Sequence, residues 1–336
     1  MEYSIKPKRF GRKENNPLPS KEDNWIIRVF MSIVVSGAIF IDIKGFPNSK
    51  YIPDGRNAGY VEYIHGGVSR NIVEDIANLE LRPTFLGIAD ESALGDDVIR
   101  KLENHKVNTR YMRRIPNGMG TWLAVFDEKG DLAGSISQRP NLMPILDVLE
   151  EHGDEIFKDA DSVVLEIDMD KEIVKKFIQL CEKYNTKLYG AVSNMAIAIE
   201  RRDFLQKFDC FICNQLEAGM FFSDDFADKA PEELCEIISK KVISGKIPSM
   251  IVTMGEKGAV YADMNGDKGC APAKKVFVKD TTGAGDAFCA GVVSGLTYGK
   301  SLKEAIEIGT RLSSSVIISS ENVCPRFLPE ELGIEL

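Results

Sequence analysis

The chain has 336 residues, a length that one large α/β domain can accommodate. Its 51 acidic and 42 basic side chains give a formal net charge of −9, which argues against a nucleic-acid polymer as partner. No apolar run approaches the roughly 20 residues of a membrane span, and no secretory signal opens the chain. Seven scattered cysteines fit a reducing compartment better than a disulfide framework. We therefore expect a cytoplasmic protein without a membrane partner.

The polar N-terminus differs in composition from the rest of the chain. Residues 1–24 contain many charges and three prolines, without apolar periodicity. We predict a disordered polar tail over 1–24 and one folded domain over 25–336. Two strand-rich inserts, at about 46–65 and 108–138, interrupt the domain and are interpreted as a small β-lid.

Apolar runs and helical periodicity then alternate along the chain. Strands are expected at 33–42 (interrupted by Ser36-Gly37), 83–88, 162–165, 187–189, 210–213 and 250–253, and helices at 69–79, 93–105, 171–183 and 231–244. A hairpin at 258–278 precedes a helix that begins near Gly283, and Ser301 with Glu304 forms a capping box for the next helix. This order predicts an α/β fold with a mostly parallel sheet covered by helices on both faces. Ligands are expected at the carboxyl ends of its strands.

The most informative stretch lies late in the chain. It reads Asp280-Thr281-Thr282-Gly283-Ala284-Gly285-Asp286, a turn of small residues that runs directly into a helix. The first N–H groups of a helix lack internal partners and lie at the positive end of its dipole, so a phosphate can bind there. Asp286 would take the proton of an attacking hydroxyl, which together suggests phosphoryl transfer. The alternative is a plain turn with an acid in a favourable first helical turn.

A second group of candidate residues surrounds the first strand and helix. Asp42 ends the first predicted strand, where a carboxylate can accept hydrogen bonds from two sugar hydroxyls. Gly66 and Gly67 permit close backbone approach, and Asn71 in the following first turn can bond a ligand hydroxyl. An ordinary strand-end acid and a plain strand-to-helix turn remain the alternatives.

Two later strand ends carry further candidates. Asn214 and Glu217 have the spacing of a helix cap, and Glu217 can also face a Mg²⁺ through water. Thr253, Gly255 and Gly258 follow the next strand, where the glycines either admit the phosphates of a nucleotide or simply form the turn.

Taken in order, these motifs resemble the ribokinase-like (PfkB) carbohydrate and nucleoside kinases over about residues 31–325. The stretches Asn57-x-Gly59-x-Val61 and Gly66-Gly67-Val68-x-Arg70-Asn71-Ile72 are most similar to the pseudouridine kinase branch. The resemblance implies a three-layer α/β/α sandwich with a small β-lid, and a homodimer through the lids. It also implies MgATP as phosphoryl donor and a possible K⁺ site.

The resemblance assigns a role to each matching position. Asp286 would be the catalytic base, Gly283, Ala284 and Gly285 the anion hole, and Asp42, Gly66, Gly67 and Asn71 the acceptor site. Asn214, Thr253, Gly255 and Gly258 would bind the nucleotide, Glu217 would lie by Mg²⁺, and Asp280 with Thr282 would bind the monovalent cation. The expected reaction is phosphorylation of a primary hydroxyl, with pseudouridine as the acceptor that the motifs favour.

Some residues depart from the family pattern. Val68 replaces the lysine that often follows the glycine pair in ribokinases, which argues against free ribose as acceptor. Tyr51, Tyr60, Tyr63 and Trp122 in the lid either stack a nucleobase or form lid and dimer core. Another sugar or nucleoside as acceptor, and a non-catalytic sugar- or nucleoside-binding regulator, are the alternatives. No G-x-G-x-x-G follows the first strand and no Walker A sequence is present, which argues against a dinucleotide-dependent oxidoreductase and a P-loop kinase.

Overall fold

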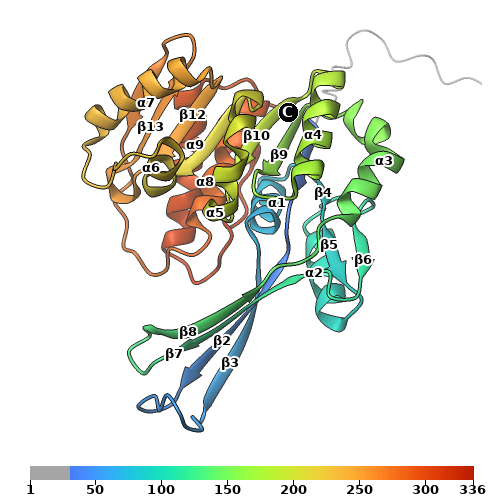
Figure 1. The fold of residues 1–336 in the computed structure, drawn as a ribbon, viewed down its shortest axis with the longest axis vertical. Coiled ribbons are helices and arrows are strands. Elements are labelled where there is room, and N and C mark those ends of the chain that lie inside the picture. The colour runs from blue at the N-terminus through green and yellow to red at the C-terminus, as the bar shows by residue number, and fades with distance from the viewer. Residues whose placement is uncertain (1–30) are drawn as a thin grey trace, which may run out of the picture.

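The central feature of the computed structural model, which describes residues 31–336, is an eight-stranded mixed sheet (Figure 1). Its strands run in the spatial order β14 (Lys268–Ala271), β13 (Ala259–Asp263), β12 (Ser249–Thr253), β11 (Cys210–Asn214), β10 (Lys187–Ala191), β9 (Ser162–Glu166), β1 (Ile33–Ser36) and β4 (Thr84–Leu86). The six neighbouring strands β4, β1, β9, β10, β11 and β12 are parallel to one another. Strand β13 pairs antiparallel with both β12 and β14. Parallel strands need crossover helices, which explains why both faces are covered.

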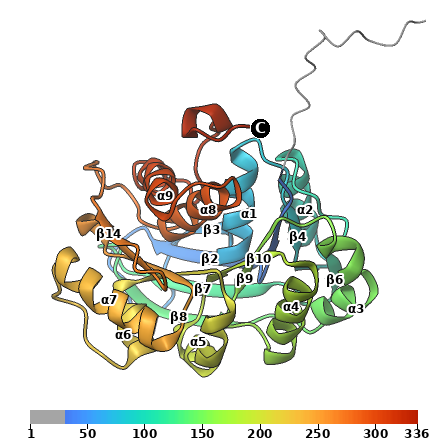
Figure 2. The same cartoon turned by 90° about the horizontal axis from the view of Figure 1, so that it is seen from above.

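Helices form a layer on each face of the sheet (Figure 2). One layer contains α1 (Val68–Asn78), α2 (Ala93–Asn104), α8 (Ala284–Thr297) and α9 (Leu302–Ile317). The other contains α3 (Pro144–Phe157), α4 (Lys171–Tyr184), α5 (Met195–Ala198), α6 (Gln215–Phe222) and α7 (Pro231–Gly245). Short 3₁₀ helices lie at η1 (Ile199–Lys207), η2 (Gly255–Lys257) and η3 (Pro329–Leu332). A separate hydrophobic cluster fills each interface between sheet and helices, as the sequence alternation predicts.

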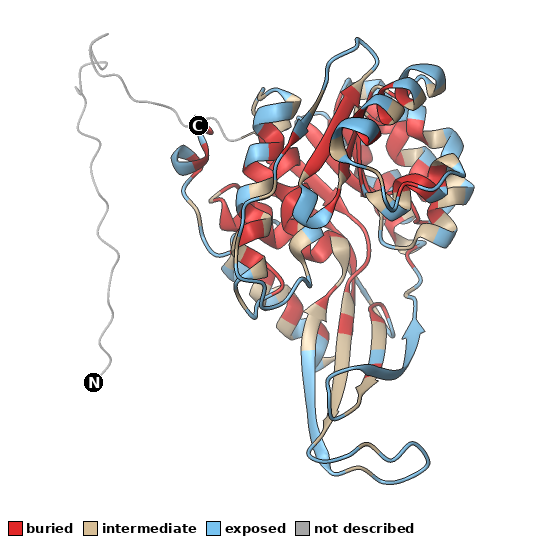
Figure 3. Ribbon diagram, turned by 90° about the vertical axis from the view of Figure 1, so that its left-hand side faces the viewer, coloured by how far each residue is buried: buried red, intermediate tan, exposed pale blue. Residues whose placement is uncertain are grey.

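A four-stranded sheet projects from the main body and forms the lid (Figure 1). Its order is β3 (Gly59–Gly66), β2 (Phe40–Pro47), β7 (Gly120–Phe126) and β8 (Leu132–Gln138). A two-stranded sheet of β5 (Ile88–Asp90) and β6 (Arg113–Ile115) lies beside the base of the lid. Most of the lid surface is exposed or half-buried, whereas the strands of the main sheet other than β14 are largely buried (Figure 3).

The predicted strand over 33–42, with its interruption at Ser36-Gly37, is two strands in different sheets. The chain leaves the main sheet after Ser36 and enters the lid at Phe40, so Asp42 lies within lid strand β2. Gly37 lies in this break, and a Cβ there would come within 2.3 Å of Ser69 Oγ and 2.5 Å of Glu166 Cδ. A residue with a side chain does not fit at that position, and the strand direction changes there.

Other expectations concern the ends of the chain and its thiols. The predicted tail, 1–24, lies outside the described residues. Among residues 31–336, none of the helices combines the length and apolar character that a bilayer span requires. The seven cysteines are free thiols.

Candidate active site

The start of α8 forms a shaped backbone turn. Gly283 is the N-cap with φ +78°, and a Cβ there would lie 2.0 Å from the carbonyl oxygen of Asn322. The first bond into the helix runs from Ala287 N–H to the Gly283 carbonyl at 2.9 Å, so the amides of Gly285 and Asp286 precede the intrahelical ladder. A Cβ on Gly285 would meet open space. The turn therefore presents helix N-terminal amides to a space that an anion can enter.

Asp286 lies half-buried in the first turn of α8. Asn71, in the first turn of α1, donates its Nδ2–H to Asp286 Oδ2 at 2.6 Å. Burial raises the pKa of Asp286 to about 7; the Asn71 hydrogen bond and the Arg70 charge oppose this rise, and the Glu217 charge adds to it. A carboxylate that titrates near neutral pH is matched to general-base work.

Asp42 and the glycine pair are positioned by the base of the lid. A Cβ on Gly66 would lie 2.8 Å from Asp42 Oδ2, so the carboxylate packs directly against this glycine. Gly67 has φ +101°, and a Cβ there would lie 2.5 Å from the Ala38 carbonyl oxygen. Burial raises the pKa of Asp42, and the charges of Lys44 and Arg70 oppose the rise. The Arg70 charge thus opposes the rise in pKa at both Asp42 and Asp286.

Asn214 and Thr253 lie side by side, because they are register partners at the carboxyl ends of β11 and β12. The predicted cap is confirmed: Asn214 Oδ1 accepts from Glu217 N–H at 2.9 Å, and Glu217 Oε2 accepts from Asn214 N–H at 2.8 Å. Burial raises the pKa of Glu217, and the nearby Asp168 carboxylate contributes. The capping hydrogen bonds with Asn214 therefore orient Glu217, and its negative charge contributes to the raised pKa of Asp286.

The two glycines after β12 differ in their surroundings. Gly255 has φ +57° and meets open space, whereas a Cβ on Gly258, at φ +97°, would lie 2.0 Å from the Ala271 carbonyl oxygen. Gly258 is thus required by close packing against β14, and Gly255 lines a more open surface.

Asp280 and Thr282 form a tight turn beside the lid. Asp280 Oδ1 accepts from Thr282 N–H at 2.8 Å, and both residues line a cavity of about 350 Å³ that also contains Lys44 and Asn322. Partial burial would raise the pKa of Asp280, but the Thr282 hydrogen bonds and the Lys44 charge outweigh this effect and lower the pKa. This acid is therefore ionised under ordinary conditions.

Two buried acids at the end of β9, Glu166 and Asp168, were missed from the sequence. Burial and the Asp168 charge raise the pKa of Glu166 to about 8, while Ser69 N–H donates to its Oε1 at 2.9 Å. Asp168 accepts from Ser193 N–H at 2.9 Å and pairs with Arg139 Nη2 at 3.2 Å. The signal was available, because both acids stand at the carboxyl end of a predicted strand.

The segment after α9 was missed as well. Asn322 Nδ2 donates to the His65 carbonyl at 2.8 Å, and Cys324 N–H donates to Asp75 Oδ1 at 2.6 Å. Together with the close approach of the Asn322 carbonyl to Gly283, these bonds join β3 and α1 to the start of α8. No motif in the sequence marks this role.

The family model described as pfkB family carbohydrate kinase matches residues 31–325. The chain belongs to the pfkB family of carbohydrate kinases. The kinase is 32% identical over 292 residues to a guanosine-inosine kinase of Exiguobacterium acetylicum, covering 86% of this chain and 95% of that protein. It is 22% identical to a pseudouridine kinase of Escherichia coli, covering 85% and 90% of the two chains.

Solved structures show the same fold. Arabidopsis thaliana ribokinase complexed with ribose and ATP superposes with a TM-score of 0.76 at 20% identity, covering 90% of this kinase and 99% of that chain. The predicted ribokinase-like fold and the predicted kinase class are confirmed. Kinases of this family use ATP with a metal ion, and they act on sugars or nucleosides.

Proposed function

We propose that the protein transfers the γ-phosphoryl group of ATP to the 5′-hydroxyl of a nucleoside. The observation that carries this proposal is the hydrogen bond between Asn71 and Asp286, which joins the acceptor side of the site to the phosphate-binding turn. Asp42 lies on the same side and offers a carboxylate to the vicinal ribose hydroxyls.

The chemistry assigned to the chain is one proton transfer and one charge stabilisation. Asp286 accepts the proton of the 5′-hydroxyl as its oxygen bonds to the γ-phosphorus, and the bond from that phosphorus to the β-bridging oxygen breaks to release ADP. The amides of the turn that Gly283, Ala284 and Gly285 form hold the charge of the transferring group. Asn71 orients the base and contacts the acceptor.

The residues present fit MgATP. Asn214, Thr253 and Gly255 lie at the carboxyl ends of β11 and β12 or directly after them, and Gly258 fixes the following turn. The described residues hold no group of three or more His, Cys, Asp or Glu side chains that could bind a metal. Mg²⁺ commonly binds through one or two carboxylates, water and substrate phosphates, a pattern that Glu217 can serve. Since ATP and Mg²⁺ are abundant in the cytoplasm, we place the enzyme there.

A monovalent cation such as K⁺ is proposed at Asp280 and Thr282. The low pKa of Asp280 keeps its carboxylate charged, and the turn places its oxygens at the wall of the cavity beside the lid. Lys44 lines the same cavity, so its ammonium competes with a cation for Asp280.

For the acceptor, we propose guanosine or inosine first and pseudouridine second. Trp122 is the direct register partner of Asp42 across β2 and β7, so the indole and the carboxylate project from the same face of the lid. An indole beside a ribose-binding acid can stack a nucleobase. The 32% identity to a guanosine-inosine kinase favours the purine nucleosides, and the Gly66-Gly67-Val68-x-Arg70-Asn71 stretch supports pseudouridine.

The test is initial-rate ATP turnover with guanosine, inosine, pseudouridine, adenosine and ribose, combined with identification of the phosphorylated product. We expect the highest kcat/KM on a purine nucleoside. Trp122→Ala should raise KM for that nucleoside about tenfold or more while KM for ATP changes little, since base stacking contributes about 1–3 kcal/mol. Turnover of ribose above every nucleoside would refute the proposal.

We also propose a homodimer through the lid. Tyr63, Ile43, Leu123 and Ile136 are consecutive register partners and form one apolar row across the sheet, on the face opposite Asp42. Three of them are exposed, by 60% at Tyr63, 41% at Leu123 and 69% at Ile136. Such a row is costly to leave in water. Ile136→Asp should give a monomer in sedimentation equilibrium, and an unchanged mass would contradict the proposal.

A further inference from the structure

A buried arginine lies beside the proposed base but is assigned no role by the family motifs of the sequence. The side chain of Arg70 has a relative exposure of 0% and that of its ion-pair partner, Glu74, 1%. Arg70 Nη1 pairs with Glu74 Oε2, and Arg70 Nη2 donates to Asn71 Oδ1 and to the His65 carbonyl. Burial of an ion pair is costly and frequently improves stability little compared with apolar side chains.

The contacts of Arg70 determine which way the Asn71 amide faces, and Asn322 Nδ2, which donates to the same Asn71 Oδ1 at 3.4 Å, supports that orientation. A guanidinium can only donate, so the atom of Asn71 that it contacts must be the oxygen. The amide nitrogen is then directed at Asp286 Oδ2, 2.6 Å away. With the opposite orientation, the amide oxygen would face a carboxylate and repel it.

We infer that Arg70 and Glu74 are positioning residues for catalysis: the buried ion pair holds the Asn71 amide in the single orientation that keeps Asp286 ready to accept a proton. The inference rests on the proposed role of Asp286 as the base. Neither Arg70 nor Glu74 needs to touch a substrate for this role, since the effect passes through Asn71.

The electrostatics of the site agree with this geometry. The charge of Arg70 lowers the pKa of Asp286, against the larger opposing effect of burial. The other titratable or charged groups whose fields reach Asp286 are Glu217 on α6, Asp75 on α1 and Cys289 on α8 itself. Burial raises the pKa of Asp75 and of the Cys289 thiol well above their ordinary values. Arg70 therefore supplies a positive charge that opposes the effects of burial and of Glu217 on the pKa of Asp286.

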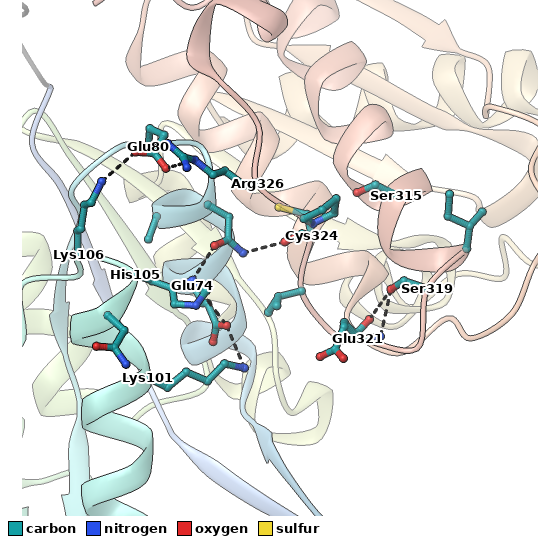
Figure 4. Close-up of a pocket in the computed structure, with 16 residues that line it drawn as sticks. Glu74, Glu80, Lys101, His105, Lys106, Ser315, Ser319, Glu321, Cys324 and Arg326 are labelled. Atoms are coloured by element: carbon teal, nitrogen blue, oxygen red, sulfur yellow. Dashed lines mark hydrogen bonds and ion pairs between the residues drawn. The ribbon is translucent and has the colours of Figure 1, made fainter.

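The outer end of the ion pair reaches a second cavity (Figure 4). Glu74 Oε1 pairs with Lys101 Nζ at 3.0 Å, and both residues line a cavity of about 760 Å³ between α1, α2 and the segment after α9. Burial would raise the pKa of Glu74, but the charges of Arg70 and Lys101 outweigh it and lower this pKa. Glu74 is thus ionised and keeps Arg70 in place from the side away from the substrate.

The test compares Arg70→Met with the double variant Arg70→Met/Glu74→Gln. The single variant leaves Glu74 buried without its main partner and can fail to fold, whereas the double variant removes both charges together. Arg70→Lys keeps the charge without the planar fork that contacts Asn71. Lys106→Met is the matched control, because Lys106 lines the same cavity but pairs with Glu80 at 3.0 Å.

Two readouts are measured on the full-length enzyme. The first is kcat/KM against pH, where the double variant should move the acidic limb to higher pH. This shift corresponds to a roughly three- to tenfold loss near pH 6.5 that is largely recovered near pH 9. Arg70→Lys should lie between the parent and the double variant, and Lys106→Met should match the parent.

The second readout is the infrared titration of the Asp286 carboxyl, with Asp286→Asn as the blank that identifies its band. It needs no turnover, so it still decides the inference if Asp286→Asn proves active and the base role fails. The inference predicts a higher apparent pKa of Asp286 in the double variant. A folded double variant with the pH profile and the carboxyl titration of the parent would overturn it, and would leave Arg70 as a structural residue only.

Discussion

Replacing Asp286 by asparagine should stabilise the folded protein, and the gain should grow with pH. Burial raises the pKa of this carboxyl from 3.8 to about 7. The folded state therefore keeps the proton up to about pH 7, while the unfolded chain loses it near pH 4. Between these values the unfolded state binds fewer protons, so the stability contributed by the protonated group is lost as pH rises.

The magnitude follows from the difference in pKa. A difference of about three pKa units between the folded and unfolded states, at about 1.4 kcal/mol per unit, lowers the stability of the parent by roughly 4 kcal/mol above pH 7. Roughly 3 kcal/mol of this cost accumulates between about pH 4.5 and pH 8. An asparagine carries no such cost, and its amide oxygen still accepts the Asn71 hydrogen bond.

The assay is urea unfolding of the parent and of Asp286→Asn across this pH range. Asp280→Asn is the control of opposite sign, because the pKa of Asp280 is lowered and its charge stabilises the folded state at neutral pH. The difference between Asp286→Asn and the parent should increase by about 2–3 kcal/mol from pH 4.5 to pH 8. A gain that does not change with pH would refute the reasoning, since it would show that Asp286 titrates at its ordinary value.

Three further predictions concern the site. The kcat/KM of the parent should fall about tenfold for each pH unit below about 7, because Asp286 must be ionised to act as base; a profile that is flat down to pH 5 would contradict this role. Gly283→Ala should lower the free energy of unfolding by about 2 kcal/mol or more and nearly abolish turnover, since φ is +78° and the new methyl group would meet the Asn322 carbonyl. Gly285→Ala, which meets open space, is its stability control. The glutamine of Glu217→Gln can still accept the Asn214 hydrogen bond, so the melting temperature should not change. The Mg²⁺ concentration for half-maximal activity should rise several-fold. An equal rise in the control Glu256→Gln would argue against a role of Glu217 in binding Mg²⁺.

Much of the fold could be predicted from the chain, because its alternation of apolar runs and helical periods is strong. The helix at 171–183 was observed as α4, Lys171–Tyr184, and the strand at 210–213 as β11, Cys210–Asn214. The capping box at Ser301 and Glu304 was also confirmed, since it depends only on local spacing.

What could not be predicted depends on contacts between distant segments. Asp42 was placed at a strand end because the sequence showed an interruption at Ser36-Gly37 but not that the chain moves there into a second sheet; the close packing of Gly37 against Ser69 and Glu166 depends on residues distant in the chain. Helix α3, Pro144–Phe157, was missed as an element. The link between Asn71 and Asp286 spans 215 residues of sequence, so motifs could suggest each residue but not the amide orientation that connects them.

The residues after α9 are translated later than every motif residue of the candidate site, and this order has a consequence for activity. A nascent chain stopped at Ile317 would already contain Asp42, Asn71 and Asp286. It would lack Asn322, whose carbonyl contacts the turn at Gly283 and whose amide nitrogen donates to the His65 carbonyl and to Asn71 Oδ1. Translation of the segment after Ile317, which contains Asn322, therefore completes the candidate active site, and a chain truncated at Ile317 would contain every motif but leave the turn at Gly283 unsupported.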